Sequence, residues 1–206
     1  MQVVKGNDGL ETVLAQGINV EGTPCMLLMQ MPLPRSLQAE GAEDSFIRTL
    51  SQMQDDLRRD YVTGAYNAVY LNEQYRPIAE RAAMSGTPVG VVMVRVNEYW
   101  QLREHESDSA ANCCLNMAAG ILQLAVGPDH DKAVLARLND GFFAIVTIGT
   151  PAAKMAQTVR EAMNDSRREF NISLSRRGSF TVAIASAEWG ETASWDMTLS
   201  LAQQRL

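Results

Sequence analysis

The sequence predicts an α/β fold of the α+β kind, in which helices cover a central mixed sheet, preceded by a β-hairpin and a helical stalk. Two observations support this prediction. Stretches of helical period alternate with short β-branched runs along residues 60–206, an order that builds a helix-covered sheet. Two of these runs are joined by Asn139-Asp140-Gly141, a tight-turn sequence, so we place their hairpin at the centre of the sheet.

Composition excludes several classes of protein. The chain has 206 residues, 46% of them hydrophobic and 20% charged, which is typical of a globular protein. A net charge of −6 argues against binding to nucleic acid, which needs a concentrated basic face. Three cysteines without framework or metal-ligand spacing argue against a disulfide scaffold and a structural metal site, so we expect no metal and no cofactor. With no signal-peptide pattern and no membrane-length apolar run, we expect a cytoplasmic protein.

Two elements are expected before the main domain. Residues 10–33 favour a β-hairpin with a turn at 21–24, and residues 1–36 are interpreted either as a loose arm or as the remnant of a PAS-like sensor. Residues 37–59 form the expected linker helix. Its apolar side chains recur at heptad spacing, at Phe46, Leu50, Met53 and Leu57. This pattern favours a helix that pairs with its twin in a homodimer, the alternative being a helix that packs on its own domain.

The main domain, residues 60–206, is expected to alternate helices and strands. A helix over Asn67–Met84 should kink or start a new turn at Pro77. The nearly unbroken β-branched run Val89–Val96 predicts a strand covered on both faces. The remaining elements are a helix at Ser107–Val126, strands at Ala133–Leu138 and Phe142–Ile148, a helix at Ala152–Asn164, a strand at Phe180–Ser186 and a helix at Trp195–Leu206.

Four segments of this domain occur in the order and at the spacing of one known family. They are Asp60–Asn67 (DYVTGAYN), Gly90–Val94 (GVVMV), the pair Ala136–Leu138 and Ala144–Val146, and Phe180–Ala185 (FTVAIA). Together they resemble the GGDEF domain of diguanylate cyclases, including its D-x-L-T-G-L-x-N opening and its late V-T-x-S-x-G strand, where Ala185 replaces the usual glycine. The resemblance covers residues 60–206 and implies a bacterial protein of cyclic-di-GMP signalling.

The signature turn departs from this family's pattern. Asn139-Asp140-Gly141-Phe142-Phe143 aligns with G-G-D-E-F, so only Phe143 matches. In the family, the two acidic positions bind a divalent metal and assist the attack of a 3′-hydroxyl on an α-phosphate. Gly141 and Phe142 occupy those positions here, and neither binds Mg²⁺. Asp140 lies one residue early, a step that points its side chain elsewhere on a hairpin.

Further positions implied by the resemblance are also substituted. The second metal ligand aligns with Arg95, whose cation repels Mg²⁺, and Asn97 lies two residues on and faces the same side. The guanine-reading positions align with Arg103, Glu104 and Asn112, the lysine after the first strand with Trp100, and the ends of the product-inhibition motif with His130 and Ala133.

These substitutions predict a degenerate, catalytically inactive signalling domain. It would act as a regulatory or dimerisation relay, as a homodimer through the linker helix and with an upstream sensor module or protein partner. One alternative is a metal-independent nucleotide- or phosphate-binding sensor, because arginines such as Arg95 and Arg103 bind phosphate bidentately. Against that alternative, Arg95 would close the cleft if it paired with Glu98 or Glu104. A weaker alternative is a residual diguanylate cyclase that uses Asp140.

Overall fold

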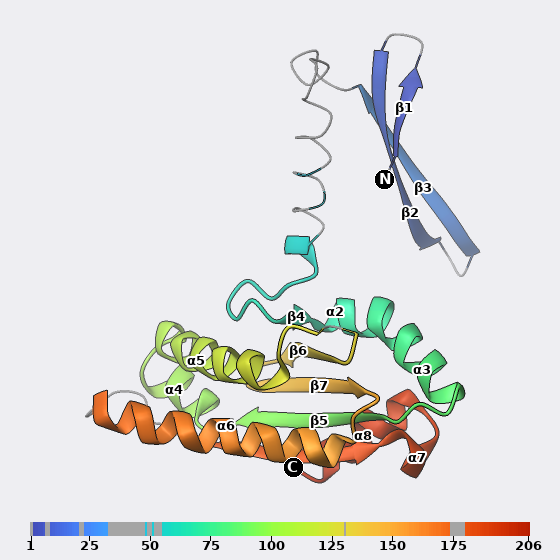
Figure 1. Ribbon diagram of the computed structural model, residues 1–206. Coiled ribbons are helices and arrows are strands. Elements are labelled where there is room, and N and C mark those ends of the chain that lie inside the picture. The colour runs from blue at the N-terminus through green and yellow to red at the C-terminus, as the bar shows by residue number, and fades with distance from the viewer. Residues whose placement is uncertain are drawn as a thin grey trace. The chain divides into compact units, whose positions relative to one another are not determined.

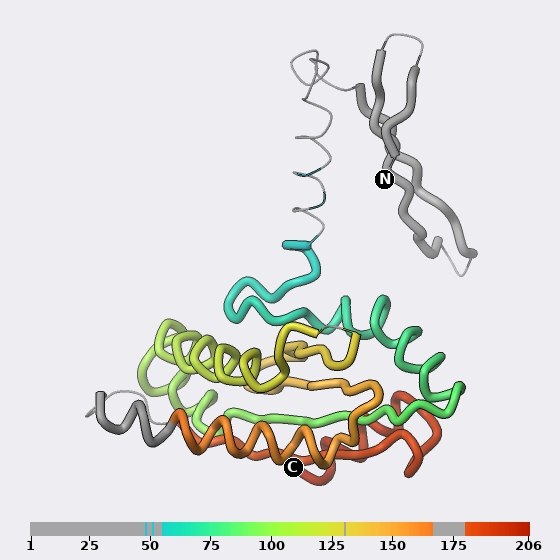
Figure 2. Tube along the Cα trace, viewed as in Figure 1, coloured from blue at the N-terminus to red at the C-terminus, as the bar shows by residue number. Residues whose placement is uncertain are grey.

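The computed structural model describes the backbone of residues 2–6, 9–20, 23–32, 48, 51, 55–129, 131–173 and 180–206. Side chains are described for residues 48, 51, 55–129, 131–166 and 180–206, and the longer of these stretches are traced in colour in Figure 2. The chain divides into two units, Met1–Asp55 and Asp56–Leu206. Each unit is described by itself.

The first unit contains a three-stranded antiparallel sheet in the order β1-β2-β3, formed by β1 (Gln2–Gly6), β2 (Gly9–Val20) and β3 (Thr23–Pro32). Strands β2 and β3 occupy the segment in which the sequence predicts a hairpin, and β1 is an additional strand. Within the expected linker helix, the described residues Arg48, Ser51 and 55–57 are helical. Phe46, Leu50 and Met53 lie outside the described residues, so the heptad pairing stays a prediction.

The second unit is built around a five-stranded sheet in the order β4-β6-β7-β5-β8 (Figure 1). Its strands are β4 (Tyr66–Asn67), β5 (Val89–Val96), β6 (Ala133–Asn139), β7 (Phe142–Ile148) and β8 (Val182–Glu188). The β4–β6 pair is parallel and the other pairs are antiparallel. The predicted mixed sheet with the β6–β7 hairpin inside it is therefore confirmed.

Helices cover both faces of this sheet, as the sequence predicts. One face packs against α4 (Tyr99–His105), α5 (Asp108–Val126) and α6 (Ala152–Ser173), and the other against α2 (Ala68–Tyr70), the π-helical turn η2 (Leu71–Tyr75), α3 (Arg76–Met84), α7 (Trp189–Thr192) and α8 (Trp195–Gln204). Along β5, Val92 and Val94 enter the first core, whereas Val91 and Met93 enter the second. The strand is therefore buried on both faces, which explains its nearly unbroken apolar sequence.

The helix predicted over Asn67–Met84 is broken into α2, η2 and α3. The backbone N–H of Arg76 donates to the carbonyl of Leu71, five residues back, which is the spacing of a π-helix. Pro77 follows immediately and has no N–H of its own, so the α-helical hydrogen-bond pattern is interrupted there and restarts as α3. Other differences are the additional helix α4, a longer α6, and a β8 shifted two residues toward the C-terminus.

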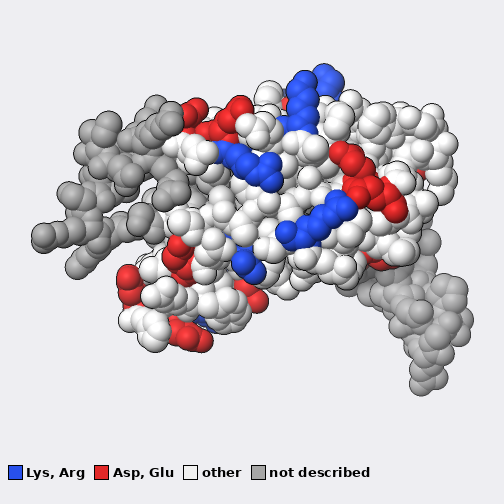
Figure 3. Space-filling view, turned by 90° about the horizontal axis from the view of Figure 1, so that it is seen from below, with Lys and Arg blue, Asp and Glu red and all other residues white. Residues whose placement is uncertain are grey.

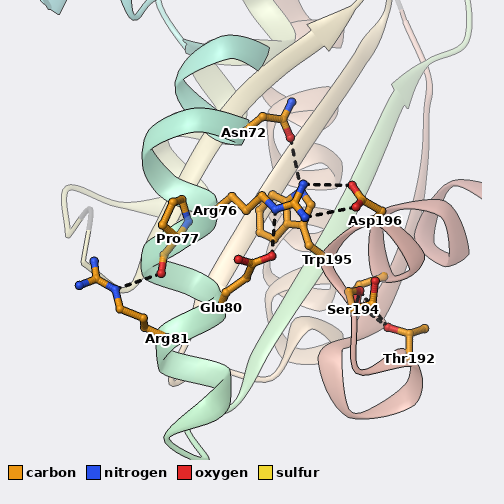
Figure 4. A network of polar contacts seen from close by, with 10 residues as sticks. Asn72, Arg76, Pro77, Glu80, Arg81, Thr192, Ser194, Trp195 and Asp196 are labelled. Atoms are coloured by element: carbon orange, nitrogen blue, oxygen red, sulfur yellow. Dashed lines mark hydrogen bonds and ion pairs between the residues drawn. The ribbon is translucent and has the colours of Figure 1, made fainter. Parts of the chain in front are cut away.

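The C-terminal helix α8 is fastened to η2 and α3 by polar contacts (Figure 4). Arg76 donates from Nη1 and Nη2 to Asp196 at 3.3 and 3.2 Å, and from Nε to Glu80 at 2.9 Å. Trp195, which is 1% exposed, donates from Nε1 to Asn72 Oδ1 at 3.3 Å. The π-helical turn thus places Asn72 where it satisfies the buried indole N–H.

Helix α5 is, within the described parts of the chain, the one helix whose length and apolar composition would allow it to cross a membrane. Here it packs on the sheet of the second unit, with Ala111, Leu115, Ala118 and Leu122 almost completely buried. A position in the domain core accounts for this composition.

Strand β8 forms one edge of the five-stranded sheet. Arg160 of α6 donates from Nη2 to the carbonyl of Ile184 at 3.2 Å, and Arg205 at the end of α8 donates from Nη1 to that of Ser186 at 2.8 Å. These arginines occupy outward carbonyls that a further strand would need. On the face seen in Figure 3, basic and acidic side chains are interspersed rather than gathered by sign.

Candidate functional site

The tip of the β6–β7 hairpin is the signature turn, residues 139–143. It packs against the segment that joins β5 to α4. Asp140 takes the left-handed conformation, with φ of 38°. Gly141 is buried, and its carbonyl accepts a hydrogen bond from the backbone N–H of Val96 at 2.9 Å. A Cβ atom at position 141 would lie 2.9 Å from Cβ of Tyr99 and 3.0 Å from the carbonyl oxygen of Val96. A side chain therefore fits at this position only if the neighbouring backbone or Tyr99 moves.

A second contact holds the turn from the opposite side. Arg137 donates from Nε and Nη2 to the carbonyl of Asp140 at 3.2 and 3.1 Å, and from Nη1 to both carboxylate oxygens of Asp60 at 3.1 Å. Thr63 donates to Asp60 Oδ1 from its backbone N–H at 2.9 Å and its hydroxyl at 2.7 Å. Burial alone would raise the pKa of Asp60, but the hydrogen bonds from Thr63 and Arg137 and the charge of Arg137 bring this pKa below its ordinary value.

Arg103 stands at a position that the resemblance assigns to guanine reading. Its side chain forms ion pairs with neighbouring acids. Its Nε lies 2.9 Å from Asp108 Oδ1 at the start of α5, and its Nη1 lies 4.0 Å from Asp140 Oδ1 in the turn. The guanidinium also lies over the ring of Trp100, 5.4 Å from its centroid. These contacts link α4, α5 and the signature turn.

Arg95, at the position of a family metal ligand, has different partners. It lies opposite Phe142 in the β5–β7 register and donates from Nε to Asn97 Oδ1 at 3.3 Å. Glu98 does not pair with Arg95, because its carboxylate accepts two hydrogen bonds from the backbone and hydroxyl of Thr181, both at 2.7 Å. In the part of the chain that the structure describes, no carboxylate forms an ion pair with Arg95, so the pairing with Glu98 or Glu104 is not formed.

The remaining positions taken from the resemblance are dispersed. Arg95 and Arg103 have separate partners. Glu104 is exposed on α4, Trp100 is 48% exposed, and Asn112 lines a groove on the side of α5 that faces Tyr61. Ala133 is buried at the start of β6, and His130 lies outside the described residues.

The residues present do not fit a magnesium ion. Mg²⁺ takes hard oxygen ligands, chiefly carboxylates and water. The positions that the resemblance assigns to its ligands hold Arg95 and Gly141, and the nearby acids Asp108 and Asp140 face the guanidinium of Arg103. Throughout the described ranges, no group of three or more His, Cys, Asp or Glu side chains is placed to hold a metal ion.

Two ion pairs that organise the site are not predicted from the sequence. Asp108 lies five residues after Arg103, and that spacing signals a pair only within a helix, whereas here α4 ends between them. Asp60 and Arg137 lie 77 residues apart, and only the resemblance to two motifs of one family links them.

Comparison with known proteins places these observations in a family context. Residues 57–206 match the family model described as "Diguanylate cyclase, GGDEF domain". The structure is similar to that of the coiled coil and GGDEF domain of DgcB from Caulobacter crescentus in complex with c-di-GMP, with a TM-score of 0.68 and 18% identity, over 82% of this chain and 89% of that one.

Two proteins of Pseudomonas aeruginosa share the fold as well. The FimX GGDEF domain matches with a TM-score of 0.59 and 21% identity, over 71% of this chain and 90% of that one. Diguanylate cyclase SiaD, in complex with its activator SiaC, matches with a TM-score of 0.55 and 17% identity, over 82% of this chain and 68% of that one.

Proposed function

The chain belongs to the GGDEF domain family of diguanylate cyclases, and we propose that it is a degenerate, catalytically inactive member that acts as a regulatory or dimerisation relay in cyclic-di-GMP signalling. The observation that carries this proposal is the packing of the signature turn. Gly141 stands where the family has a metal-binding acid, and a Cβ there would lie 2.9 Å from Tyr99. The site therefore lacks both the carboxylate and the space for one.

The charge at the second metal position supports the same proposal. Arg95 lies opposite Phe142 in the sheet, so a cation and an aromatic ring occupy neighbouring positions where the family uses acids. A fixed positive charge opposes the binding of Mg²⁺. A residual cyclase would have to use Asp140, whose carboxylate lies 4.0 Å from Nη1 of Arg103.

The contacts of the turn suggest how a conformational signal would travel. Leu57 and Arg58 lie at the end of the stalk, and Asn67 of the domain binds both of them. Its backbone N–H donates to the carbonyl of Arg58 and its side chain to that of Leu57, both at 2.8 Å. Asp60 follows in the chain and binds Arg137, which holds the carbonyl of Asp140. A movement at the stalk end would thus reach the signature turn through hydrogen-bonded neighbours.

Pairing of two chains through the stalk is the second part of the proposal. Leu57, the last position of the predicted heptad pattern, is 79% exposed, as expected for an apolar side chain that awaits a partner. The match to the structure that includes a coiled coil covers 82% of this chain, against 71% for an isolated GGDEF domain. We assign residues 1–36 to a sensor remnant, 37–59 to the linker helix and 60–206 to the GGDEF domain.

A location in the cytoplasm and an upstream sensor or protein partner complete the proposal. The structure of SiaD with its activator SiaC supports the idea that a partner protein acts on a domain of this fold.

A second candidate function rests on Arg95. With no ion-paired carboxylate among the described residues, its guanidinium retains donors for a phosphate group, which arginine binds without a metal. The domain would then sense a nucleotide or phosphate. Arg103 contributes less to this candidate than the sequence suggests, because Asp108 already holds its Nε.

Calorimetric titration of GTP and cyclic di-GMP into the full chain, with and without Mg²⁺, tests these functions. The relay predicts no binding under either condition. Binding that needs no Mg²⁺ and is lost in Arg95→Gln, but kept in the control Arg81→Gln, would establish the second candidate. Arg81 is a suitable control because it is exposed and donates to a carbonyl of its own helix. Mg²⁺-dependent GTP binding with turnover would refute the relay.

A further inference from the structure

We propose that a cavity beside the start of the domain binds a small anion that carries an aromatic ring, the chemistry shared by aromatic carboxylates and nucleoside monophosphates. The cavity measures about 470 Å³, a size typical of small-molecule sites. It lies between residues 59–66, the C-terminal part of α5 and strand β6. The residues that the argument uses are Arg59, Thr63, Tyr66, Gln123, Val126 and Leu135.

The walls of the cavity are held in place by backbone pairing. Asp60 donates its N–H to the carbonyl of Ala65, and Gly64 donates to that of Asp60, both at 2.8 Å. Arg59 and Tyr66 form a β-bridge that closes this short loop. From the opposite wall, Gln123 of α5 donates from Nε2 to the carbonyl of Thr63 at 3.4 Å. The shape is thus largely preformed, which lowers the entropic cost of binding.

The floor of the cavity is apolar and one wall is cationic. Leu135 and Ala65 are 5% and 2% exposed, and Val126 is half-buried beside them. The guanidinium of Arg59 lies 4.6 Å from the centroid of the Tyr66 ring and donates from Nη1 to the carbonyl of Gly64 at 2.8 Å. A flat apolar surface next to a fixed cation suits a planar ring that carries a negative group.

The charge of Arg59 is the reason to expect an anionic ligand. Among the residues that the structure describes, Arg59 forms no ion pair with a carboxylate, and one of its donors is used by Gly64. The other face of Tyr66 is covered by Tyr70, whose ring centroid lies 3.9 Å away, so the aromatic stack fixes the guanidinium from one side only. A carboxylate or phosphate on the open side would accept the remaining hydrogen bonds.

This site is separate from the signature turn and goes beyond the proposed function. None of its lining residues is Arg95, Arg103 or a residue of the turn. It does adjoin the path from the stalk, because Thr63 in its wall donates two hydrogen bonds to Asp60. An occupant would therefore stabilise the junction between the stalk and the domain.

The test is a titration of the ¹⁵N-labelled full chain followed by NMR. The probes are 4-hydroxybenzoate and AMP, which combine a ring with an anion, and adenosine and inorganic phosphate, which supply one feature each. We expect AMP, 4-hydroxybenzoate or both to shift the backbone amides of Gly64 and Gly127 and the side-chain amide of Gln123, with weaker effects of adenosine and phosphate. Whichever of AMP and 4-hydroxybenzoate binds more tightly identifies the ligand class as nucleotide or aromatic carboxylate.

Three variants keep the result decisive. Arg59→Gln should weaken binding about tenfold or more, because a charge-assisted hydrogen bond is lost. Arg58→Gln is the matched control and should bind as the wild type does, since Arg58 lies 6.0 Å from the ring centroid of Tyr70 and does not line the cavity. Val126→Phe, which fills the cavity and leaves both arginines in place, should abolish binding even if Arg59→Gln perturbs the loop.

Three outcomes would overturn the inference. They are the absence of shifts at the lining residues with every probe, equal affinity of Arg59→Gln and the wild type, or binding of inorganic phosphate as tight as that of AMP and 4-hydroxybenzoate. Each would leave the relay proposal intact, because that proposal is tested with GTP and cyclic di-GMP at the signature turn.

Discussion

Replacement of Gly141 by alanine tests the claim that the signature turn has no room for a side chain. The added Cβ would lie 2.9 Å from Cβ of Tyr99 and 3.0 Å from the carbonyl oxygen of Val96, both closer than ordinary contact. Tyr99 and Val96 are 5% and 2% exposed, so neither has open space to move into. The φ of Gly141 is not in the left-handed region, and any cost is therefore steric rather than a backbone strain.

The expected magnitude follows from two opposing effects. Overpacking a filled site costs about 1–3 kcal/mol. A glycine-to-alanine change returns roughly 0.4–1 kcal/mol by reducing the freedom of the unfolded chain. The free energy of unfolding of Gly141→Ala should therefore fall by about 1–2 kcal/mol. Urea denaturation followed by tryptophan fluorescence measures it, since Trp195 is 1% exposed and should report the loss of tertiary structure.

Gly120→Ala provides the control. Gly120 lies inside α5 on its exposed side, and a Cβ there meets no atom within 4 Å. Alanine at this position should raise the free energy of unfolding by up to about 1 kcal/mol through its helix propensity. If Gly141→Ala is as stable as the wild type, or is stabilised as Gly120→Ala is, then Tyr99 yields easily and the steric argument against an acid at position 141 fails.

The remaining predictions concern the stalk junction and the stalk itself. A double-mutant cycle of Asp60→Asn and Arg137→Met, followed by urea denaturation, should give a coupling energy of about 1–3 kcal/mol, because the two side chains are only 17% and 13% exposed. If the effects of the two substitutions on the free energy of unfolding simply add, the pair is not coupled. The folded-state pKa of Asp60 lies below its ordinary value of 3.8, so the pair should stabilise the fold fully above that pH and lose this contribution as the pH falls toward the folded-state pKa. Asp60→Asn should remove this part of the dependence of unfolding free energy on pH. An unchanged dependence on pH in the variant would contradict the assignment. Leu57→Asp should weaken self-association in sedimentation velocity whereas Leu124→Asp, at an equally apolar position that is 84% exposed, should not; a chain that is monomeric at every concentration would refute pairing through the stalk.

Elements with strong periodicity could be predicted from the sequence, and elements set by tertiary contacts could not. The bounds of β5 match because a β-branched run buried on both faces leaves a clear signal. The start of α5 matches because Ser107 caps it, accepting from the N–H of Ala110. The π-helical turn before Pro77 was missed, since a proline inside a helical pattern does not reveal whether the chain kinks, restarts or widens.

At the candidate site, the sequence identifies which residues stand at each position but not what they contact. The resemblance supplies Arg95 and Arg103, whereas their partners depend on the local fold: Arg103 meets Asp108 because the end of α4 adjoins the start of α5. The pairing of Arg95 with Glu98 fails because Thr181, which lies just before β8, offers Glu98 two donors. A hydrogen bond between residues 83 positions apart leaves no periodic trace in the sequence.

The proposed inactivity and the proposed relay are connected by the way the turn is held. Arg137 holds the carbonyl of Asp140, and the backbone N–H of Val96, at the end of β5, holds the carbonyl of Gly141. An element clamped on both sides transmits displacement better than one with a free, solvated tip. A catalytic turn must instead leave room for two metal ions and a nucleotide. The closed packing that excludes an acid at position 141 therefore favours coupling between the stalk and α4.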